Sequence, residues 1–181
     1  MFRLIFGLIL LLIVNQGLSS DMLGTQQKRF ENLALRLWDN PELGYLEVKS
    51  SNLLQKELKN EGFKIENNLA DIPTAFRAVY GESGPTIGIL GEFDALPGLS
   101  QTNSPFQEKA PNSNGAGHAC GHHLFGAGSA WAAVMIKQWL IETKTPGRII
   151  FFGTPAEEGG SGKVYMAREG AFENVDIMFH W

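Results

Sequence analysis

Short apolar runs alternate with longer helical patterns along this chain, and this alternation restricts its fold more than any other feature. The runs are rich in apolar and β-branched residues, as strands are; they cover residues 63–65, 74–80, 86–90, 149–152 and 175–179. Helices are expected where apolar residues recur every three or four positions or form a long run; these segments are 25–40, 46–60, 124–143 and 163–168. Strands that alternate with helices predict a layered α/β domain with a largely parallel sheet.

The first 20 residues have the pattern of a cleaved secretory signal peptide. Arg3 precedes an apolar stretch from Leu4 to Val14, and small or polar residues follow as far as Ser20. A membrane anchor is the alternative, but a spanning helix needs about 20 apolar residues. We therefore predict a signal peptide over 1–20, a mature chain over 21–181 without a stable membrane span, and a secreted or periplasmic location.

The charge of the chain argues against nucleic acid as a partner. The formal net charge is −4, and no long basic run or basic-aromatic stripe occurs in the sequence. With 44% hydrophobic and 19% charged residues, the composition is that of a soluble globular domain. A small-molecule substrate or ligand is the expected partner.

A long loop is expected over residues 98–117. This segment contains Pro105 and Pro111, several asparagines and serines, and no hydrophobic periodicity. Loops of this length in compact domains are usually functional or disordered.

One short segment contains most of the cysteine and histidine side chains, which are common metal ligands. The sequence GAGHACGHHLFGAG (115–128) holds the only cysteine, Cys120, and three of the four histidines. Cys120 and His122 are two residues apart, and the glycines around them allow a tight turn that aims both at one ion. Two other interpretations stay open: a buried cysteine with histidines at the start of the next helix, or a Cys–His nucleophile pair.

Acidic side chains follow two of the predicted strands. Glu92 and Asp94 follow one strand, Glu157 and Glu158 follow another, and His180 lies near the end of a third. Ligands of α/β proteins bind in the crevice beyond the carboxyl ends of the strands, so we expect these side chains to converge. Adjacent carboxylates repel each other unless a cation is close. On extended backbone the two glutamates would point in opposite directions, one toward a metal and the other toward a water.

A thiolate, imidazoles and a carboxylate around a cation, beside a free carboxylate, suit hydrolysis. The cation lowers the pKa of a bound water, and the free carboxylate takes its proton. The candidate ligands are numerous enough for two divalent ions about 3.5–4 Å apart. The thiolate favours zinc, whereas the carboxylates and imidazoles also admit manganese, cobalt or nickel.

Five blocks of the sequence resemble one enzyme family. They are NPELGYLE (40–47), GEFDALPG (91–98), GHACGHH (117–123), TPAEEGGSGK (154–163) and VDIMFHW (175–181). In this order they resemble the metal-dependent amidohydrolases and peptidases that include hippurate hydrolase, indole-acetyl-amino-acid hydrolases and aminoacylase, with the aminobenzoyl-glutamate utilisation protein B branch most similar. The resemblance implies a zinc-peptidase-like catalytic domain, a three-layer α/β sandwich of which this chain is an incomplete N-terminal part without the lid domain. It also implies cleavage of an amide between an acyl or aroyl group and an amino acid.

The resemblance further implies roles for single residues. Cys120, His122 and Glu158 correspond to metal ligands. Glu157 corresponds to the general base that acts on the metal-bound water, and Asp94 to an aspartate that orients a ligand. The implied cofactor is a divalent metal, two ions per site, zinc or manganese, with cobalt or nickel as alternatives. The full-length protein is implied to be a homodimer formed through the lid domain.

The histidines outside this set are less easily assigned. The family's histidine ligand would follow Trp181, so His180 stands two residues short of it, about 6.6 Å along a strand. We predict that His180 lines the site without being a ligand, and that the 181-residue chain binds metal weakly and is inactive alone. His118 and His123 have no implied role. The alternative to an enzyme is a non-catalytic protein that binds amino-acid conjugates on the same fold.

Overall fold

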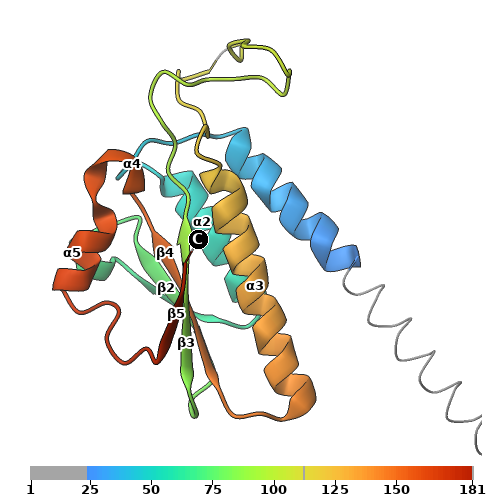
Figure 1. The fold of residues 1–181 in the computed structure, drawn as a ribbon, viewed down its shortest axis with the longest axis vertical. Helices are drawn as coiled ribbons and strands as arrows, with labels where there is room; N and C mark the ends of the chain where they lie inside the picture. Colours follow the sequence, from blue (N-terminus) through green and yellow to red (C-terminus); the bar gives the residue numbers. More distant parts are fainter. Residues whose placement is uncertain (1–23, 112, 181) are drawn as a thin grey trace, which may run out of the picture.

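Within the residues that the computed structural model describes, 24–111 and 113–180, a five-stranded sheet lies between two layers of helices (Figure 1). The strands are β1 (Lys64–Asn67), β2 (Phe76–Tyr80), β3 (Thr86–Glu92), β4 (Arg148–Thr154) and β5 (Ile177–Phe179). Their order across the sheet is β1-β2-β4-β3-β5. The predicted α/β sandwich is confirmed, and each predicted strand occurs with small shifts at its ends.

The sheet is mixed rather than largely parallel. β3 runs parallel to β4 and β5, whereas β2 pairs antiparallel with both β4 and β1. Residues 68–75, which join β1 to β2, contain only the short 3-10 helix η1 (Leu69–Asp71). Parallel neighbours need a crossover of about a dozen residues or more, so this short connection makes an antiparallel pair instead.

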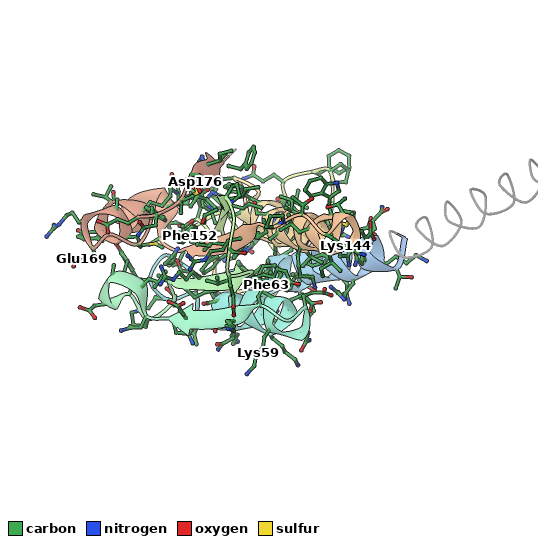
Figure 2. The ribbon with its side chains drawn as sticks, turned by 90° about the horizontal axis from the view of Figure 1, so that it is seen from below. Lys59, Phe63, Lys144, Phe152, Glu169 and Asp176 are labelled. Atoms are coloured by element: carbon green, nitrogen blue, oxygen red, sulfur yellow. The ribbon has the colours of Figure 1, made fainter. Side chains whose placement is uncertain are left out.

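One face of the sheet is covered by α2 (Val48–Asn60) and α3 (His122–Thr143), and the helix that includes residues 24–38 packs into the same core. These spans agree with the predicted helices. The apolar sides of these helices form the main core together with one face of the sheet. This core includes Phe30, Leu33, Leu37, Leu54, Leu58, Phe76, Ile89, Val134 and Phe151. In Figure 2 Phe63 and Phe152 lie between the layers and Lys59 lies at the lower edge of the molecule.

The opposite face carries a smaller layer that includes α4 (Glu157–Gly160) and α5 (Gly162–Arg168) (Figure 1). Along β4, Ile149 and Phe151 belong to the main core, whereas Ile150 and Phe152 pack with Phe172 on the other side. Successive side chains of a strand point to opposite faces. The continuous apolar run of β4 therefore reflects a strand that is covered on both faces.

α3 begins at His122, two residues before its expected start. Gly121 has φ +79°, a left-handed conformation that glycine adopts readily, so the loop turns directly into the helix.

By length and composition α3 is also apolar enough to cross a membrane. Its buried residues, such as Ala130 and Val134, are part of the main core, and core helices of this kind meet the same criteria.

The segment between β3 and α3 is irregular over most of its length, as predicted for residues 98–117. The Ser100 hydroxyl donates to Ser113 at 2.8 Å, and Leu96 and Gly117 pair their backbones across the base of the loop. The predicted signal peptide over 1–20 lies outside the described residues.

Candidate metal centre

The side chain of His122, at the start of α3, is buried between two carboxylates. Its Nδ1 atom lies 3.0 Å from Oδ1 of Asp94, and its Nε2 atom lies 3.1 Å from Oε2 of Glu92. Burial alone would lower the pKa of His122, but the hydrogen bonds to Asp94 and Glu92 raise it to about 10. His122 is therefore an imidazolium at neutral pH unless a metal competes for Nε2.

The Nε2 atom of His122 also faces both glutamates that follow β4. It lies 3.9 Å from Oε2 of Glu157 and 3.9 Å from Oε1 of Glu158. Glu92, His122 and Glu157 each offer one donor atom, and these three atoms lie within 4.8 Å of one another. The acidic strand ends and the Cys/His segment thus meet at one place, as expected from the sequence.

Glu92, the last residue of β3, is ionised although it is buried. Burial opposes ionisation, but hydrogen bonds from His122, Lys163 and His180 lower the pKa of Glu92 to about 2. Lys163 of α5 forms a direct ion pair with it. From the sequence, Glu92 is expected at a strand end, but neither Glu92 nor Lys163 has an expected role. The two residues are 71 positions apart, so no local sequence pattern indicates that they pair.

Asp94 connects His122 to the glutamate pair. Its carboxylate is buried; Oδ1 accepts a hydrogen bond from Nδ1 of His122, and Oδ2 accepts one from the backbone N–H of Glu158 at 2.9 Å. A carboxylate on one ring nitrogen fixes the orientation of a metal-binding histidine and leaves the other nitrogen for the ion. Asp94 therefore has the position that its predicted orienting role requires.

The two glutamates begin the short helical turn α4 and do not lie on extended backbone. Ala156, which precedes them, has φ +56°, and Oε1 of the fully buried Glu47 accepts its N–H at 2.7 Å. A Cβ atom added to Gly44 would lie 2.9 Å from Cα of Ala156, so the two backbones are in close contact. The expectation of opposite directions along a strand is wrong, because the helical turn lets both glutamates face the imidazole.

The block NPELGYLE (40–47) supports both acidic segments. The hydroxyl of Tyr45 donates to the carbonyl of Gly160 at 2.5 Å, at the end of α4. The carbonyl of Glu42 accepts the N–H of Ala95 at 2.8 Å, next to Asp94. This N-terminal segment therefore positions the carboxylates of the site without contributing one to it.

Cys120 is exposed and lies beside Glu158. The hydrogen bond to the Glu158 side chain is the main reason why the pKa of Cys120 is raised to about 11; burial and the charges of Glu158 and Glu157 add to it. The predicted ligands Cys120, His122 and Glu158 are thus brought together. Among the described residues, however, the group whose donor atoms lie within 4.8 Å of one another contains Glu92, His122 and Glu157 and does not include the cysteine.

His180, directly after β5, reaches the same site. Its Nε2 atom lies 3.1 Å from Oε1 of Glu92, and its ring lies edge-on to Phe125 with the ring centroids 5.5 Å apart. His180 therefore lines the site through its hydrogen bond to Glu92. That it is not itself a ligand stays a prediction.

The donor set fits a divalent cation. Four carboxylates, those of Glu92, Asp94, Glu157 and Glu158, surround one imidazole, and Oε1 of Glu158 is buried with no hydrogen-bond partner among the described residues. Negative charges this close together require protons or a cation for compensation. Carboxylate, imidazole and thiolate groups are ligands of zinc and related ions.

Replacing Asp94 with asparagine is expected to weaken zinc binding about 10- to 100-fold, the usual effect of losing a group that orients a metal-binding histidine. The amide can accept the proton of His122, but its NH₂ group then faces the N–H of Glu158 without an acceptor. Competition with a chromophoric chelator measures the affinity. Glu82→Gln, which removes the same charge from an exposed site, is the control; equal affinities for the two variants would contradict the assignment.

Comparison with known proteins agrees with this geometry. Residues 88–181, just over half of the chain, match peptidase family M20/M25/M40. One of the subunits of p-aminobenzoyl-glutamate hydrolase from Escherichia coli is 40% identical over 161 residues, which cover 89% of this chain and 34% of that protein. Hippurate hydrolase of Campylobacter jejuni is 30% identical over 157 residues, which cover 86% of this chain and 39% of that protein.

A solved structure shares the fold as well. The YXEP protein of Bacillus subtilis, described as a dinuclear metal binding peptidase, superimposes with a TM-score of 0.74 at 30% identity, over 86% of this chain and 43% of that one. The chain spans about a third of the length of the curated relatives it matches. Since the matched region contains the Cys/His segment and both glutamates, and the five sequence blocks predict the same relationship, the chain belongs to peptidase family M20/M25/M40.

Proposed function

We propose that the full-length protein hydrolyses the amide bond between an acyl or aroyl group and an amino acid, with the help of divalent metal ions. The observation that carries this proposal is the convergence of Glu92, His122 and Glu157 within 4.8 Å, with Glu158 beside them. Family membership and relatives named for aminobenzoyl-glutamate and hippurate support the substrate class.

We assign the metal to the donors around Nε2 of His122. Glu158 offers a buried oxygen without a hydrogen-bond partner among the described residues, and Cys120 lies next to it. A divalent cation bound there would lower the pKa of water and polarise the carbonyl of the substrate. The cysteine favours zinc, and the carboxylates also suit manganese, cobalt or nickel; two ions per site remain part of the proposal.

Glu157 is the residue that we assign to proton transfer. Its side chain is 41% exposed, against 18% for that of Glu158, so it is the glutamate open to water and substrate. An ionised carboxylate at hydrogen-bond distance from a water takes its proton and can pass it to the leaving amine. Asp94 meanwhile keeps the His122 ring fixed, and Lys163 neutralises Glu92.

The experiment that tests the proposal is metal analysis of the purified full-length protein, combined with hydrolysis of aroyl- and acyl-amino acids before and after chelation. We expect bound zinc, manganese, cobalt or nickel, and activity that is lost on chelation and restored by the metal. His122→Ala should lack both. If the protein instead binds amino-acid conjugates but contains no metal and does not hydrolyse them, it is the non-catalytic binding protein.

Location and assembly are part of the same proposal. The pattern of residues 1–20 supports secretion or a periplasmic location, with cleavage of a signal peptide. We also propose a homodimer of the full-length protein. N-terminal sequencing of the mature protein and light scattering of the full-length form test these two statements.

Zinc binding is expected to release about two protons per ion near pH 7.5, because a metal ligand must be deprotonated. In the metal-free chain the pKa of His122 is about 10 and that of Cys120 about 11, so both start protonated. The affinity should therefore rise with pH until these values are reached. Calorimetry in buffers with different ionisation enthalpies measures the protons; Cys120→Ser should release one fewer, and a heat independent of buffer would contradict the expectation.

A further inference from the structure

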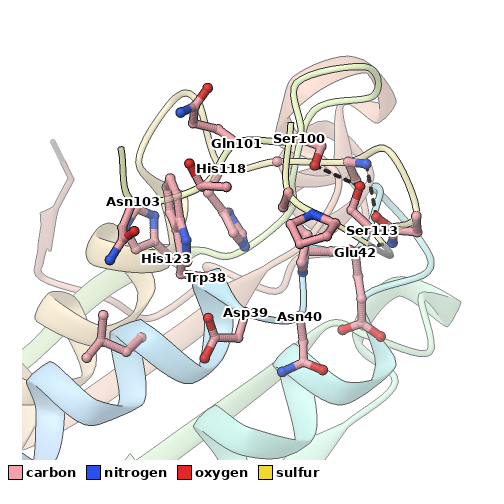
Figure 3. A pocket seen from close by; sticks show the side chains of 18 of the residues that line it. Trp38, Asp39, Asn40, Glu42, Ser100, Gln101, Asn103, Ser113, His118 and His123 are labelled. Atoms are coloured by element: carbon pink, nitrogen blue, oxygen red, sulfur yellow. Dashed lines mark hydrogen bonds between the residues drawn. The ribbon is translucent and has the colours of Figure 1, made fainter. Parts of the chain in front are cut away.

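A separate cavity of about 770 Å³ is lined by two histidines that have no role in the metal centre. His118 and His123 lie at one end of it beside Trp38, between the end of the first described helix and the loop over residues 98–117 (Figure 3). His118 is 4% exposed. The ring of His118 is therefore held inside the protein, and that of His123 is half-buried beside it.

Three nitrogens of these rings, Nδ1 and Nε2 of His118 and Nδ1 of His123, make no hydrogen bond of good geometry within the part of the chain that the structure describes. The backbone of Leu37 lies near His118 and offers its ring a weak hydrogen bond. All three atoms are fully buried. Buried polar atoms without partners are rare and destabilising, and a bound ion or water is a common explanation.

The separation of the two rings fits one shared ion. Their centroids are 5.2 Å apart, with an angle of 47° between the planes. With metal–nitrogen bonds of about 2.1 Å and about 1.1 Å more to each centroid, two imidazoles at a tetrahedral angle have centroids about 5.2 Å apart. A direct N–H···N hydrogen bond would span a similar distance, but the nitrogens of His118 make none.

Charged groups of both signs surround the two rings. Asp39, Glu42 and Lys49 line the cavity, and the imidazolium of His122 acts on both rings from the metal centre. Trp38 contacts His123 edge-on, with centroids 4.9 Å apart, and so restricts the imidazole. The nitrogens of His122, by contrast, are committed to Asp94 and Glu92 and are not part of this group.

We propose that His118 and His123 form a second cation site, distinct from the His122 centre, for a divalent ion of the zinc class. Imidazole is a preferred ligand of such ions. Two protein ligands leave further coordination positions directed into the cavity, where water or a small carboxylate ligand can complete the shell. Neither residue belongs to the set assigned to hydrolysis, so this second site is independent of the proposed function.

The test is a zinc titration of the 181-residue chain, followed through the ring ¹⁵N resonances of its four histidines. We expect the signals of His118 and His123 to shift together, in the wild type and also in His122→Ala. His118→Gln and His123→Asn should each bind one zinc equivalent fewer, with unchanged far-ultraviolet circular dichroism. His123→Asn is the safer variant, because this residue is only half-buried.

Three results would overturn the proposal. They are unmoved His118 and His123 signals at saturating zinc, a shift of only one of the two, and a loss of both shifts in His122→Ala. His180→Ala serves as the control, because it removes a histidine that contacts Glu92 and lies outside the cavity. It should leave both shifts in place.

Discussion

Replacing Glu157 with glutamine should lower amide hydrolysis by the full-length protein at least about 10²-fold, the scale of general acid–base catalysis, while its metal content stays unchanged. The amide has nearly the shape of the carboxylate but cannot accept a proton from water. Glu157 is the more exposed of the paired glutamates and lies 3.9 Å from Nε2 of His122, so its loss removes a proton acceptor and leaves the His122–Asp94 contact intact. Steady-state kinetics and elemental analysis of the same preparation measure both quantities.

The matched control for Glu157→Gln is Glu169→Gln, which removes the same charge from the exposed residue after α5. It should keep full activity. Turnover of Glu157→Gln within about twofold of the wild type would contradict the role of base, which predicts a loss of the general acid–base scale. A parallel loss of metal and activity would make Glu157 a ligand instead, since its carboxylate lies within 4.8 Å of the donor atoms of Glu92 and His122.

Replacing Glu47 with alanine should lower the free energy of unfolding by about 2–6 kcal/mol, because two buried groups lose their partner at about 1–3 kcal/mol each. These groups are the N–H of Ala156 and the hydroxyl of Thr74, which donate to Glu47 at 2.7 and 3.0 Å. Zinc affinity should fall as well, since the Ala156 turn carries both glutamates. Urea unfolding and chelator competition measure the two effects.

Glu47→Gln is the matched variant, and it should recover most of the stability. Its oxygen can accept the N–H of Ala156 while its NH₂ group donates to the oxygen of Thr74. Burial raises the pKa of Glu47 in the folded protein, so this carboxyl group favours the folded state less as pH rises through the ordinary glutamate range and above it. A neutral glutamine avoids that cost. Equal stability of Glu47→Ala and the wild type would show that this carboxylate does not hold the turn.

The convergence of the site could be predicted from sequence because it follows from local patterns. Buried strands were visible as apolar runs, and polar residues directly after them, such as Asp94 and Glu158, must lie at the carboxyl edge of the sheet. The glycines around Cys120 indicated a tight turn, and Gly121 does adopt a left-handed conformation before α3. The sequence pattern predicts the strand ends and this turn correctly because each of them depends on only a few neighbouring residues.

The remaining features depend on contacts between distant residues. The pairing of Glu92 with Lys163, the support of Ala156 by Glu47 and the antiparallel pairing of β2 with β4 each join segments far apart in the chain. The helical turn at the glutamates had no sequence signal, because Ala156 is not a residue that usually adopts positive φ. Its conformation is imposed by the segment that packs against it.

The most direct test of the metal centre is anomalous diffraction at the zinc edge from crystals of the chain grown with zinc. We expect a peak about 2.0–2.2 Å from Nε2 of His122 and from an oxygen of the adjacent glutamates, with Nδ1 still hydrogen-bonded to Asp94. Zinc bound at other positions, with Nε2 of His122 still paired to Glu92 and no peak beside it, would contradict the assignment of this centre.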